Sequence, residues 1–294
     1  MDFERQGTVM RRVLSIFLFG ALLLTGCAQA DDEEGAPVEQ TPPNATIQPS
    51  STAVYAVDEL TITIIYDNTT DNPDLMVEWG FAALIDVDGQ RILFDTGLDG
   101  PSLMNNLSVL GIDPLSIEMV VISHAHEDHT GGLRTFLAAR PGIDVYVPAS
   151  AEILAAAEEA QVRVIPVDEP REILPGVYST GTMDGGIPEQ GLVISTDEGS
   201  VVITGCAHPG IVNIVHRAVD ILPMEPALVM GGFHLGGYGS GTLRAIIDEF
   251  RAIGVRQVTP THCTGDDAIA AFAEAYGADY LPGGAGAVFT FGER

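Results

Sequence analysis

Two kinds of hydrophobic pattern alternate along residues 53–294. Short runs of β-branched and aliphatic residues are typical of buried strands, whereas apolar residues spaced three and four apart are typical of helices. The expected strands are Leu60–Tyr66, Phe81–Val87, Arg91–Phe94, Met119–Ile122, two near Val145 and Val164, Leu192–Ile194, Val201–Thr204, Ala227–Met230 and Gln257–Val258. The expected helices are Ser102–Leu110, one after Gly132, Ala149–Glu159, one after Pro209, Thr242–Ile253 and Asp266–Tyr276. This alternation predicts one α/β domain.

Turn signals and the distribution of strands predict how the strands are grouped. Asp88-Gly89 separates two strand patterns, and this dipeptide favours a type I′ hairpin turn. Asp197-Glu198-Gly199 separates another pair of strands in the same way. Strand-rich stretches lie on both sides of residue 170, which suggests two sheets packed face to face.

The N-terminal segment has the pattern of an export signal. Two arginines precede the apolar run Val13–Leu24, which at about 12 residues is too short to cross a bilayer as a single helix. The run ends in Leu24-Thr25-Gly26-Cys27, which resembles a bacterial lipobox. We therefore expect a lipoprotein signal peptide over residues 1–26, lipidation of Cys27, and an exported protein anchored on the outer face of the bacterial cell membrane or in the periplasm. An ordinary secretory signal with an incidental cysteine, or a retained anchor helix, gives a similar pattern.

Composition changes after Cys27 and again near residue 53. Residues 27–52 are rich in acidic residues, Pro, Gln, Ser and Thr, and they have too little apolar surface to offset the entropy of ordering. They predict a disordered acidic linker, which leaves residues 53–294 as the folded domain. The 294-residue chain has a formal charge of -28, and its 13 basic residues are all arginines. This charge argues against nucleic acid as a partner and leaves a small molecule as the expected substrate.

The strongest chemical signal follows the expected strand Met119–Ile122. His124, His126, Asp128 and His129 fall within six residues, where that strand leads into a helix. Neutral imidazole and carboxylate are good ligands for Zn²⁺ and related divalent ions, and alternate residues of one loop can face two ions. The cluster therefore predicts a metal site.

The pattern His-x-His-x-Asp-His at residues 124–129, followed by Thr130-Gly131-Gly132, resembles the signature of the metallo-β-lactamase superfamily. Leu93–Gly97 resembles the first motif of that superfamily, in which the aspartate, here Asp95, fixes the metal-binding loop. The resemblance implies an α/β fold, an αββα sandwich of two mixed β-sheets flanked by helices. It also implies one or two divalent ions at one edge of the sheets, with Zn²⁺ expected and other divalent metals open.

Three further blocks resemble a narrower branch of the superfamily. They are Val202–Gly210, Met230–Leu235 and Thr261–Gly265. Their combination is similar to metallo-hydrolases related to dihydropterin aminobenzene ribose-phosphate synthase, which forms a methanopterin precursor. The resemblance runs from about Leu60 to the C-terminus and suggests a substrate that carries phosphate or a pterin.

One departure from the better-known hydrolases affects the ligand assignment. Those enzymes have a third histidine before the central hairpin, whereas Val177–Gln190 contains none. They also have a bridging aspartate after the next strand, where this chain has Cys206 and, two residues later, His208. We expect His208 to supply the missing imidazole and Cys206 to lie near the bridging position, either as a ligand or as a small buried hydrophobic residue.

The resemblance implies a role for most of the histidines. The expected ligands are His124, His126 and His208 for the first ion, and Asp128, His129 and His262 for the second. His234 lies among glycines, so it is expected to contact substrate, with a glycine-rich turn that packs Phe233 as the alternative. His216 falls within an expected helix and is interpreted as a helix-surface or core histidine.

Together these groups predict a metal-dependent hydrolase. A metal ion lowers the pKa of bound water from about 15.7 to about 7, and the resulting hydroxide would attack an ester, phosphoester or related bond. Asp128 and His234 are the expected catalytic residues, with His234 stabilising the charge that develops. A metal-dependent transferase, synthase or oxidoreductase on the same fold, or a noncatalytic metal-bearing surface lipoprotein, is the alternative.

Two cysteines remain after Cys27. Cys206 lies two residues before His208, and Cys263 directly follows His262. We therefore expect both near the metal edge, as free thiols rather than as a disulfide.

Overall fold

The computed structural model describes residues 55–150 and 163–292, which form two β-sheets. The first sheet has seven strands in the order β13-β1-β2-β3-β4-β5-β6. They are β1 (Leu60–Tyr66), β2 (Ala82–Val87), β3 (Gln90–Phe94), β4 (Met119–Val121), β5 (Asp144–Pro148), β6 (Val164–Val167) and β13 (Val288–Phe291). The second sheet has six strands in the order β12-β11-β10-β9-β8-β7. They are β7 (Arg171–Leu174), β8 (Val177–Ser179), β9 (Leu192–Thr196), β10 (Gly199–Thr204), β11 (Pro226–Gly232) and β12 (Gln257–Thr261).

Both sheets are mixed. Neighbours run parallel from β3 to β6 and from β10 to β12, whereas the other neighbouring strands are antiparallel. The described helices are α1 (Gly100–Val109), α2 (Glu127–Thr130), α3 (Leu133–Ala139), α5 (Ile211–Ile221), α6 (Ser240–Ile253) and α7 (Asp266–Tyr276). Three short 3-10 turns are η1 (Pro114–Ser116), η2 (His262–Thr264) and η3 (Gly277–Asp279).

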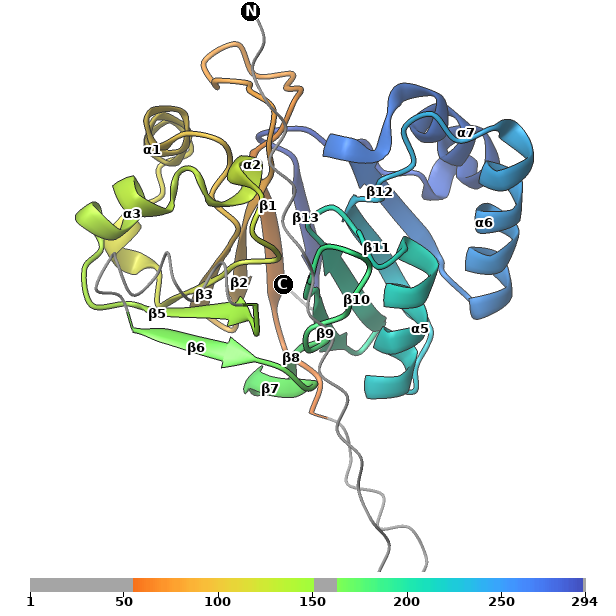
Figure 1. The fold of residues 1–294 in the computed structure, drawn as a ribbon, viewed down its shortest axis with the longest axis horizontal. Helices are drawn as coiled ribbons and strands as arrows, with labels where there is room; N and C mark the ends of the chain where they lie inside the picture. The colour runs from red at the N-terminus through yellow and green to blue at the C-terminus, as the bar shows by residue number, and fades with distance from the viewer. Residues whose placement is uncertain (1–54, 151–162, 293–294) are drawn as a thin grey trace, which may run out of the picture. The chain divides into compact units, whose positions relative to one another are not determined.

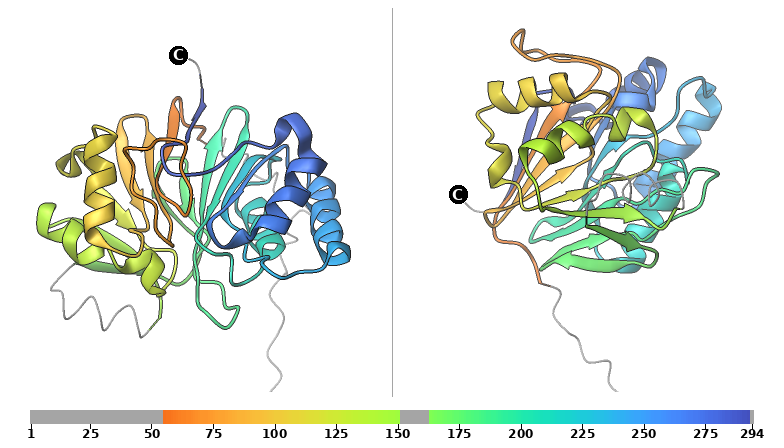
Figure 2. Two further views of the ribbon diagram at one scale, coloured as in Figure 1. Left: turned by 90° about the horizontal axis from the view of Figure 1, so that it is seen from above. Right: turned by 60° about the vertical axis from the view of Figure 1, so that its left-hand side comes forward.

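Three hydrophobic clusters hold four layers together. The central cluster packs side chains of both sheets against each other, for example Ile62 and Phe94 with Ile194 and Met230. A second cluster joins the first sheet to α1 and α3, and a third joins the second sheet to α5, α6 and α7. Figures 1 and 2 show α1 and α3 on one side of the paired sheets and α5 to α7 on the other. The predicted αββα sandwich is confirmed.

The predicted division of the strands into two sheets at residue 170 is confirmed for β1 to β12, whereas β13 belongs to the first sheet. The sheets divide at residue 170, since β6 ends the first sheet and β7 begins the second. Asp88 and Gly89 join β2 to β3 with φ values of 50° and 84°, as a type I′ turn requires. The prediction missed β7, β8 and β13, and β13 returns to the first sheet to pair with β1.

Several predictions concern residues outside the described ranges. The signal peptide, Cys27 and the acidic linker fall there, as does most of the expected helix Ala149–Glu159. Within residues 55–150 and 163–292, none of the helices has the length and apolar character needed to cross a membrane.

The topology brings chemically active residues to one edge of the sandwich. Five strands, β3, β4, β10, β11 and β12, each lead at their carboxyl ends into a loop that carries polar or sulfur-containing residues. These loop residues are Asp95, His124, Cys206, His234 and His262. Because the carboxyl ends of parallel strands meet at one edge of a sheet, the site forms there, as is general for such sheets.

Candidate metal centre

Three imidazoles converge on one point at this edge. His124 Nε2 lies 3.1 Å from His126 Nδ1. His208 Nε2 lies 3.3 Å from the same His124 nitrogen and 3.2 Å from His126 Nδ1. Three ring nitrogens with these spacings direct their lone pairs to a common position, which is the arrangement that a tetrahedral divalent ion needs. The structure therefore places His208 where the sequence expected a replacement for the missing histidine.

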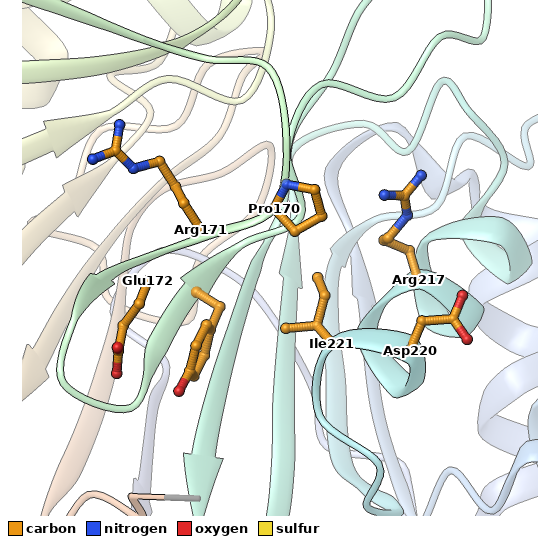
Figure 3. A pocket seen from close by; sticks show the side chains of 7 residues that line it. Pro170, Arg171, Glu172, Arg217, Asp220 and Ile221 are labelled. Atoms are coloured by element: carbon orange, nitrogen blue, oxygen red, sulfur yellow. The ribbon is translucent and has the colours of Figure 1, made fainter. Parts of the chain in front are cut away.

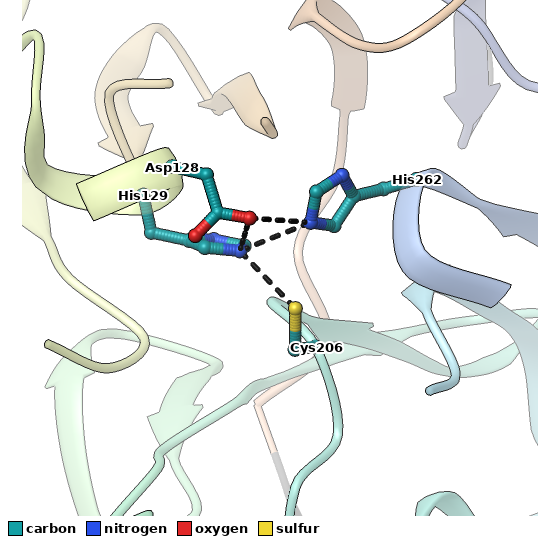
Figure 4. A group of neighbouring side chains, drawn as sticks. All are labelled: Asp128, His129, Cys206 and His262. Carbon is teal, nitrogen blue, oxygen red and sulfur yellow. Dashed lines mark hydrogen bonds and ion pairs between the residues drawn. The ribbon is translucent and has the colours of Figure 1, made fainter. Parts of the chain in front are cut away.

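A second group of donors lies beside the first (Figure 4). His129 Nε2 lies 3.2 Å from His262 Nε2 and 3.2 Å from Cys206 Sγ. Asp128 Oδ2 lies 3.3 Å from His262 Nε2. One ligand atom from each of these four residues falls within 4.8 Å of the others, and two of the residues come from the loop after β4. The six expected ligands thus divide into the two expected groups.

Cys206 joins these two groups. Its sulfur also lies within 4.8 Å of the ligand nitrogens of His124 and His208. The residue is buried, with 3% of its surface exposed. The structure places Cys206 between the two groups, where the sequence expected a bridging residue.

Asp95 positions one histidine of each group, His129 directly and His124 through Ser123. One carboxylate oxygen accepts a hydrogen bond from the backbone N–H of Ser123 at 2.7 Å. The other lies 2.7 Å from His129 Nδ1 and accepts from Ser123 Oγ, which in turn lies 2.9 Å from His124 Nδ1. Since Asp95 and Ser123 engage the Nδ1 atoms of two rings, the Nε2 atoms of those rings face the metal position.

Glu189 is a functional residue that the sequence reasoning missed. Its buried carboxylate accepts hydrogen bonds from the backbone N–H groups of Cys206, Ala207 and His208 at 2.8 to 2.9 Å. Burial is the main cause that raises the pKa of Glu189, to about 7. The available signal was an acidic residue inside the segment Val177–Gln190, where the resemblance described above led us to expect a histidine. In this chain a carboxylate at that segment holds the loop that supplies the replacement histidine.

His262 is held by the loop after β1. Asn68 Oδ1 lies 3.1 Å from His262 Nδ1, and Asn68 Nδ2 donates to the His262 carbonyl at 2.8 Å. Thr261 donates a hydrogen bond to the buried carboxylate of Asp67. Trp79 also contacts the site, because its ring centre lies 5.1 Å from that of His262 while 55% of the residue is exposed. None of these three neighbours was expected from sequence.

Backbone strain is concentrated at the site. Of the five non-glycine residues with positive φ in the described ranges, four lie here: Asp95, Ala207, His234 and His262, with φ values of 58°, 62°, 53° and 52°. Such conformations cost of order 1–3 kcal/mol each and persist only where surrounding contacts enforce them. The contacts of Glu189 and Asn68 enforce two of them.

The electrostatics of the site keep several donors available for a cation. Burial, with the nearby His129, lowers the pKa of His124 far below its usual value. Burial and the neighbouring His234 lower the pKa of His208 to about 4. Burial opposes ionisation of Asp128, but hydrogen bonding from His262 and the charge of His129 lower its pKa to about 2. Two neutral imidazoles and one carboxylate are thus present at neutral pH.

His129 has the opposite shift. Burial alone would lower its pKa, but the carboxylates of Asp95 and Asp128 raise it above the usual value. A cation that binds His129 Nε2 therefore displaces a proton.

The two remaining histidines lie in different places, His234 at the site and His216 away from it. His234 lies at the rim, with its ring centre 4.5 Å from that of His208. His216 is exposed on α5 and lies 3.1 Å from Glu249, so of the two alternatives for this residue the structure shows the helix surface and not the core. Cys206 and Cys263 are both free and both lie at the metal edge, as expected.

A separate surface pocket of about 410 Å³ lies along β7, β8 and α5 (Figure 3). Its lining is Pro170, Arg171, Glu172, Tyr178, Arg217, Asp220 and Ile221. Two arginines are balanced there by two acidic side chains, and none of the lining residues belongs to the donor groups. The metal edge is therefore the site to which the chemistry points.

Gly205 provides the space that this edge requires. A Cβ at this position would lie 2.1 Å from Ser123 Oγ and 3.1 Å from Asp95 Oδ2. We expect Gly205→Ala to lower the free energy of unfolding by about 1–3 kcal/mol, the usual cost of overpacking, and to weaken metal binding. Gly241→Ala is the matched control, since nothing lies within 4 Å of its Cβ. Equal unfolding midpoints in urea for both variants would contradict this role.

The donor set fits divalent metal ions. It offers five imidazoles, one carboxylate and one sulfur, arranged in two overlapping groups. Imidazole, thiolate and carboxylate are the ligand types that zinc prefers, and the Nδ1 contacts of Asp95, Ser123 and Asn68 supply the support that such ligands usually have.

Comparisons with known proteins agree with this geometry. Residues 80–218 match the Metallo-beta-lactamase superfamily. The chain is 28% identical over 287 residues to 7,8-dihydropterin-6-methyl-4-(beta-D-ribofuranosyl)-aminobenzene-5'-phosphate synthase of Methanocaldococcus jannaschii, with 80% of this chain and 98% of that protein covered.

Two solved structures are similar as well. Tm1679, described as a metal-dependent hydrolase of the beta-lactamase superfamily, is 28% identical with a TM-score of 0.69, over 80% of this chain and all 100% of that one. YhfI of Bacillus subtilis, a metallo-beta-lactamase fold protein, has a TM-score of 0.57 at 15% identity, over 79% and 99% of the two chains, and shares the fold alone. With its two-sheet sandwich and its histidine-rich edge, the chain has the metallo-β-lactamase fold, and its residues 80–218 match the superfamily of that name.

Proposed function

We propose that the protein is a metal-dependent hydrolase that cleaves an ester, phosphoester or related bond in a small molecule. The observation that carries this proposal is the convergence of His124, His126 and His208 beside Asp128, His129 and His262, with Cys206 between them. In the proposed site these groups hold one or two divalent ions, with zinc the best match to the donors. Such an ion lowers the pKa of bound water toward neutrality and polarises the bond to be broken.

The protein side chains have separate tasks in this proposal. Asp128 would hold the second ion, and its carboxylate, ionised because its pKa is about 2, would accept a hydrogen bond from the attacking water. His234 is exposed at the rim, beside His208, where it can donate a hydrogen bond to the charge that develops on the substrate. Asp95 and Glu189 position the ligands without touching the substrate.

A second candidate function is a synthase reaction. It is favoured by the similarity to the Methanocaldococcus jannaschii synthase, whose name describes a product that contains a dihydropterin and a phosphate. In that case the same donors would bind a pterin- or phosphate-bearing substrate and catalyse group transfer. The described site has one exposed aromatic side chain, Trp79, that could contact a planar ring.

A single assay separates the two functions. The zinc-loaded full chain is incubated with phosphoesters, lactones and thioesters, and in parallel with the precursors of the relative's product. We expect hydrolysis of at least one ester class that disappears in His126→Ala and persists in His216→Ala. Formation of the pterin product without hydrolysis would favour the synthase, and no reaction in either arm would contradict both.

We also propose that the protein is exported and held at the membrane by a lipid on Cys27. The support is the sequence Leu24-Thr25-Gly26-Cys27 after a short apolar run. In a bacterial host, Cys27→Ser is expected to move the protein from the membrane to the soluble fraction. A Cys27→Ser protein that still partitions into detergent would instead indicate an uncleaved helix.

A further inference from the structure

A third donor group lies at the same edge; it shares Cys206 with the two described groups, whereas its other members, His234 and Cys263, belong to neither. Cys263 Sγ, a nitrogen of His234 and Cys206 Sγ all lie within 4.8 Å of one another. Cys263 and His234 come from different segments, η2 and the loop after β11, so the fold and not a local motif brings them together.

The backbone makes room for the second sulfur. A Cβ on Gly232 would lie 2.6 Å from Cys263 Sγ and 2.4 Å from the Gly205 carbonyl oxygen. Glycine at this position therefore allows Cys263 to approach Cys206, whose carbonyl oxygen lies 3.5 Å from Cys263 Sγ. His234 has a positive φ of 53°, a strained conformation for a histidine, and in this conformation a ring nitrogen lies within 4.8 Å of Cys263 Sγ.

The chemistry of the group differs from that of its neighbours. The six expected ligands of the two described groups are nitrogen and oxygen donors, and one sulfur lies between them. The third group has two sulfurs and one imidazole, which are ligands that select thiophilic cations such as Zn²⁺ and Cd²⁺. His234 is exposed, so a fourth position at a tetrahedral ion would be open to solvent or to a ligand.

We propose that Cys206, Cys263 and His234 form a third cation position, for a thiophilic divalent ion, which shares Cys206 with the two histidine groups. On binding, two metal–sulfur bonds and one metal–nitrogen bond form, and the protons of the thiols pass to solvent. A thiolate sulfur has enough lone pairs to bridge ions, so a shared Cys206 is compatible with occupancy of a neighbouring group. This proposal does not depend on hydrolytic activity.

Cadmium titration tests the proposal, because cadmium–thiolate bonds absorb in the ultraviolet and can be counted. All proteins are the full chain with Cys27→Ser, so that Cys206 and Cys263 are its only cysteines. We expect three equivalents of cadmium bound. Cys263→Ser should bind one equivalent fewer and have lower thiolate absorbance, whereas His216→Ala should match the parent.

His234→Gln provides the second variant, since its position is on another segment and it leaves both sulfurs in place. It too is expected to lose one equivalent, with circular dichroism unchanged. Cys263→Ser can lose more than one equivalent of cadmium if the substitution also disturbs the adjacent His262, and in that case the proposal is judged on His234→Gln alone. Unchanged cadmium stoichiometry in Cys263→Ser would overturn the third position. Unchanged stoichiometry in His234→Gln would overturn it in the case where Cys263→Ser loses more than one equivalent. A loss of metal in His126→Ala in the same experiment would leave the proposed function intact.

Discussion

His126→Ala is expected to lose one bound divalent ion per chain and to lower hydrolysis at least a hundredfold. The His126 imidazole supplies one of three nitrogens that converge within 3.3 Å of one another, and two remaining imidazoles cannot complete a tetrahedral position. Removal of a group that acts only through the metal commonly costs factors of this size. Elemental analysis of the purified variant, combined with the ester assay, measures both effects.

The control for this variant is His216→Ala. It removes an exposed imidazole from the surface of α5, where the ring lies 3.1 Å from Glu249. We expect wild-type metal content and activity in this protein. Full metal retention in His126→Ala would remove His126 from the ligands and would contradict the assignment of the first group.

Glu189→Ala is expected to lower the free energy of unfolding of the metal-free protein by about 3 kcal/mol or more. The carboxylate accepts three backbone N–H hydrogen bonds at a fully buried position, and each buried N–H left without a partner costs about 1–3 kcal/mol. Urea unfolding in the presence of chelator measures this loss separately from any loss of metal. Metal affinity should also fall, because Cys206 and His208 lose the contacts that fix their backbone.

Glu189→Gln distinguishes the charge from the shape of this side chain. One amide oxygen can still accept from the Cys206 and Ala207 N–H groups, but the amide nitrogen would face the His208 N–H group, donor against donor. We therefore expect a smaller stability loss than in Glu189→Ala with a comparable loss of metal. Glu198→Ala, at an exposed turn position, is the matched control. If Glu189→Ala were as stable as Glu198→Ala, the supporting role of Glu189 would be wrong.

The features that could be predicted from sequence depend on short-range pattern. The strand that ends at Ile122 and the histidines that follow it are contiguous, so periodicity and ligand chemistry together predicted a donor cluster there, and the structure brings those side chains to one edge of the sheets. His208 was found differently, through a resemblance to a family and the absence of a histidine in Val177–Gln190. The structure places His208 against His124 and His126, which agrees with that inference.

The features that were missed depend on contacts between distant segments. β13 pairs with β1 from the other end of the domain, and no local pattern encodes that partner. Glu189 acts through backbone N–H groups of Cys206 to His208, and Asn68 acts on His262 across 194 positions. Such roles depend on where the fold places a side chain, which residue type and spacing alone do not determine.

The central claim is that the two histidine groups hold divalent ions with Cys206 between them. The most direct test is a crystal structure of the zinc-loaded protein with an anomalous difference map at the zinc absorption edge. We predict one peak within about 2.0–2.3 Å of donor atoms from His124, His126 and His208, and another at that distance from Asp128, His129 and His262. Zinc bound only away from these residues, or absent from both positions in a fully loaded crystal, would contradict the account.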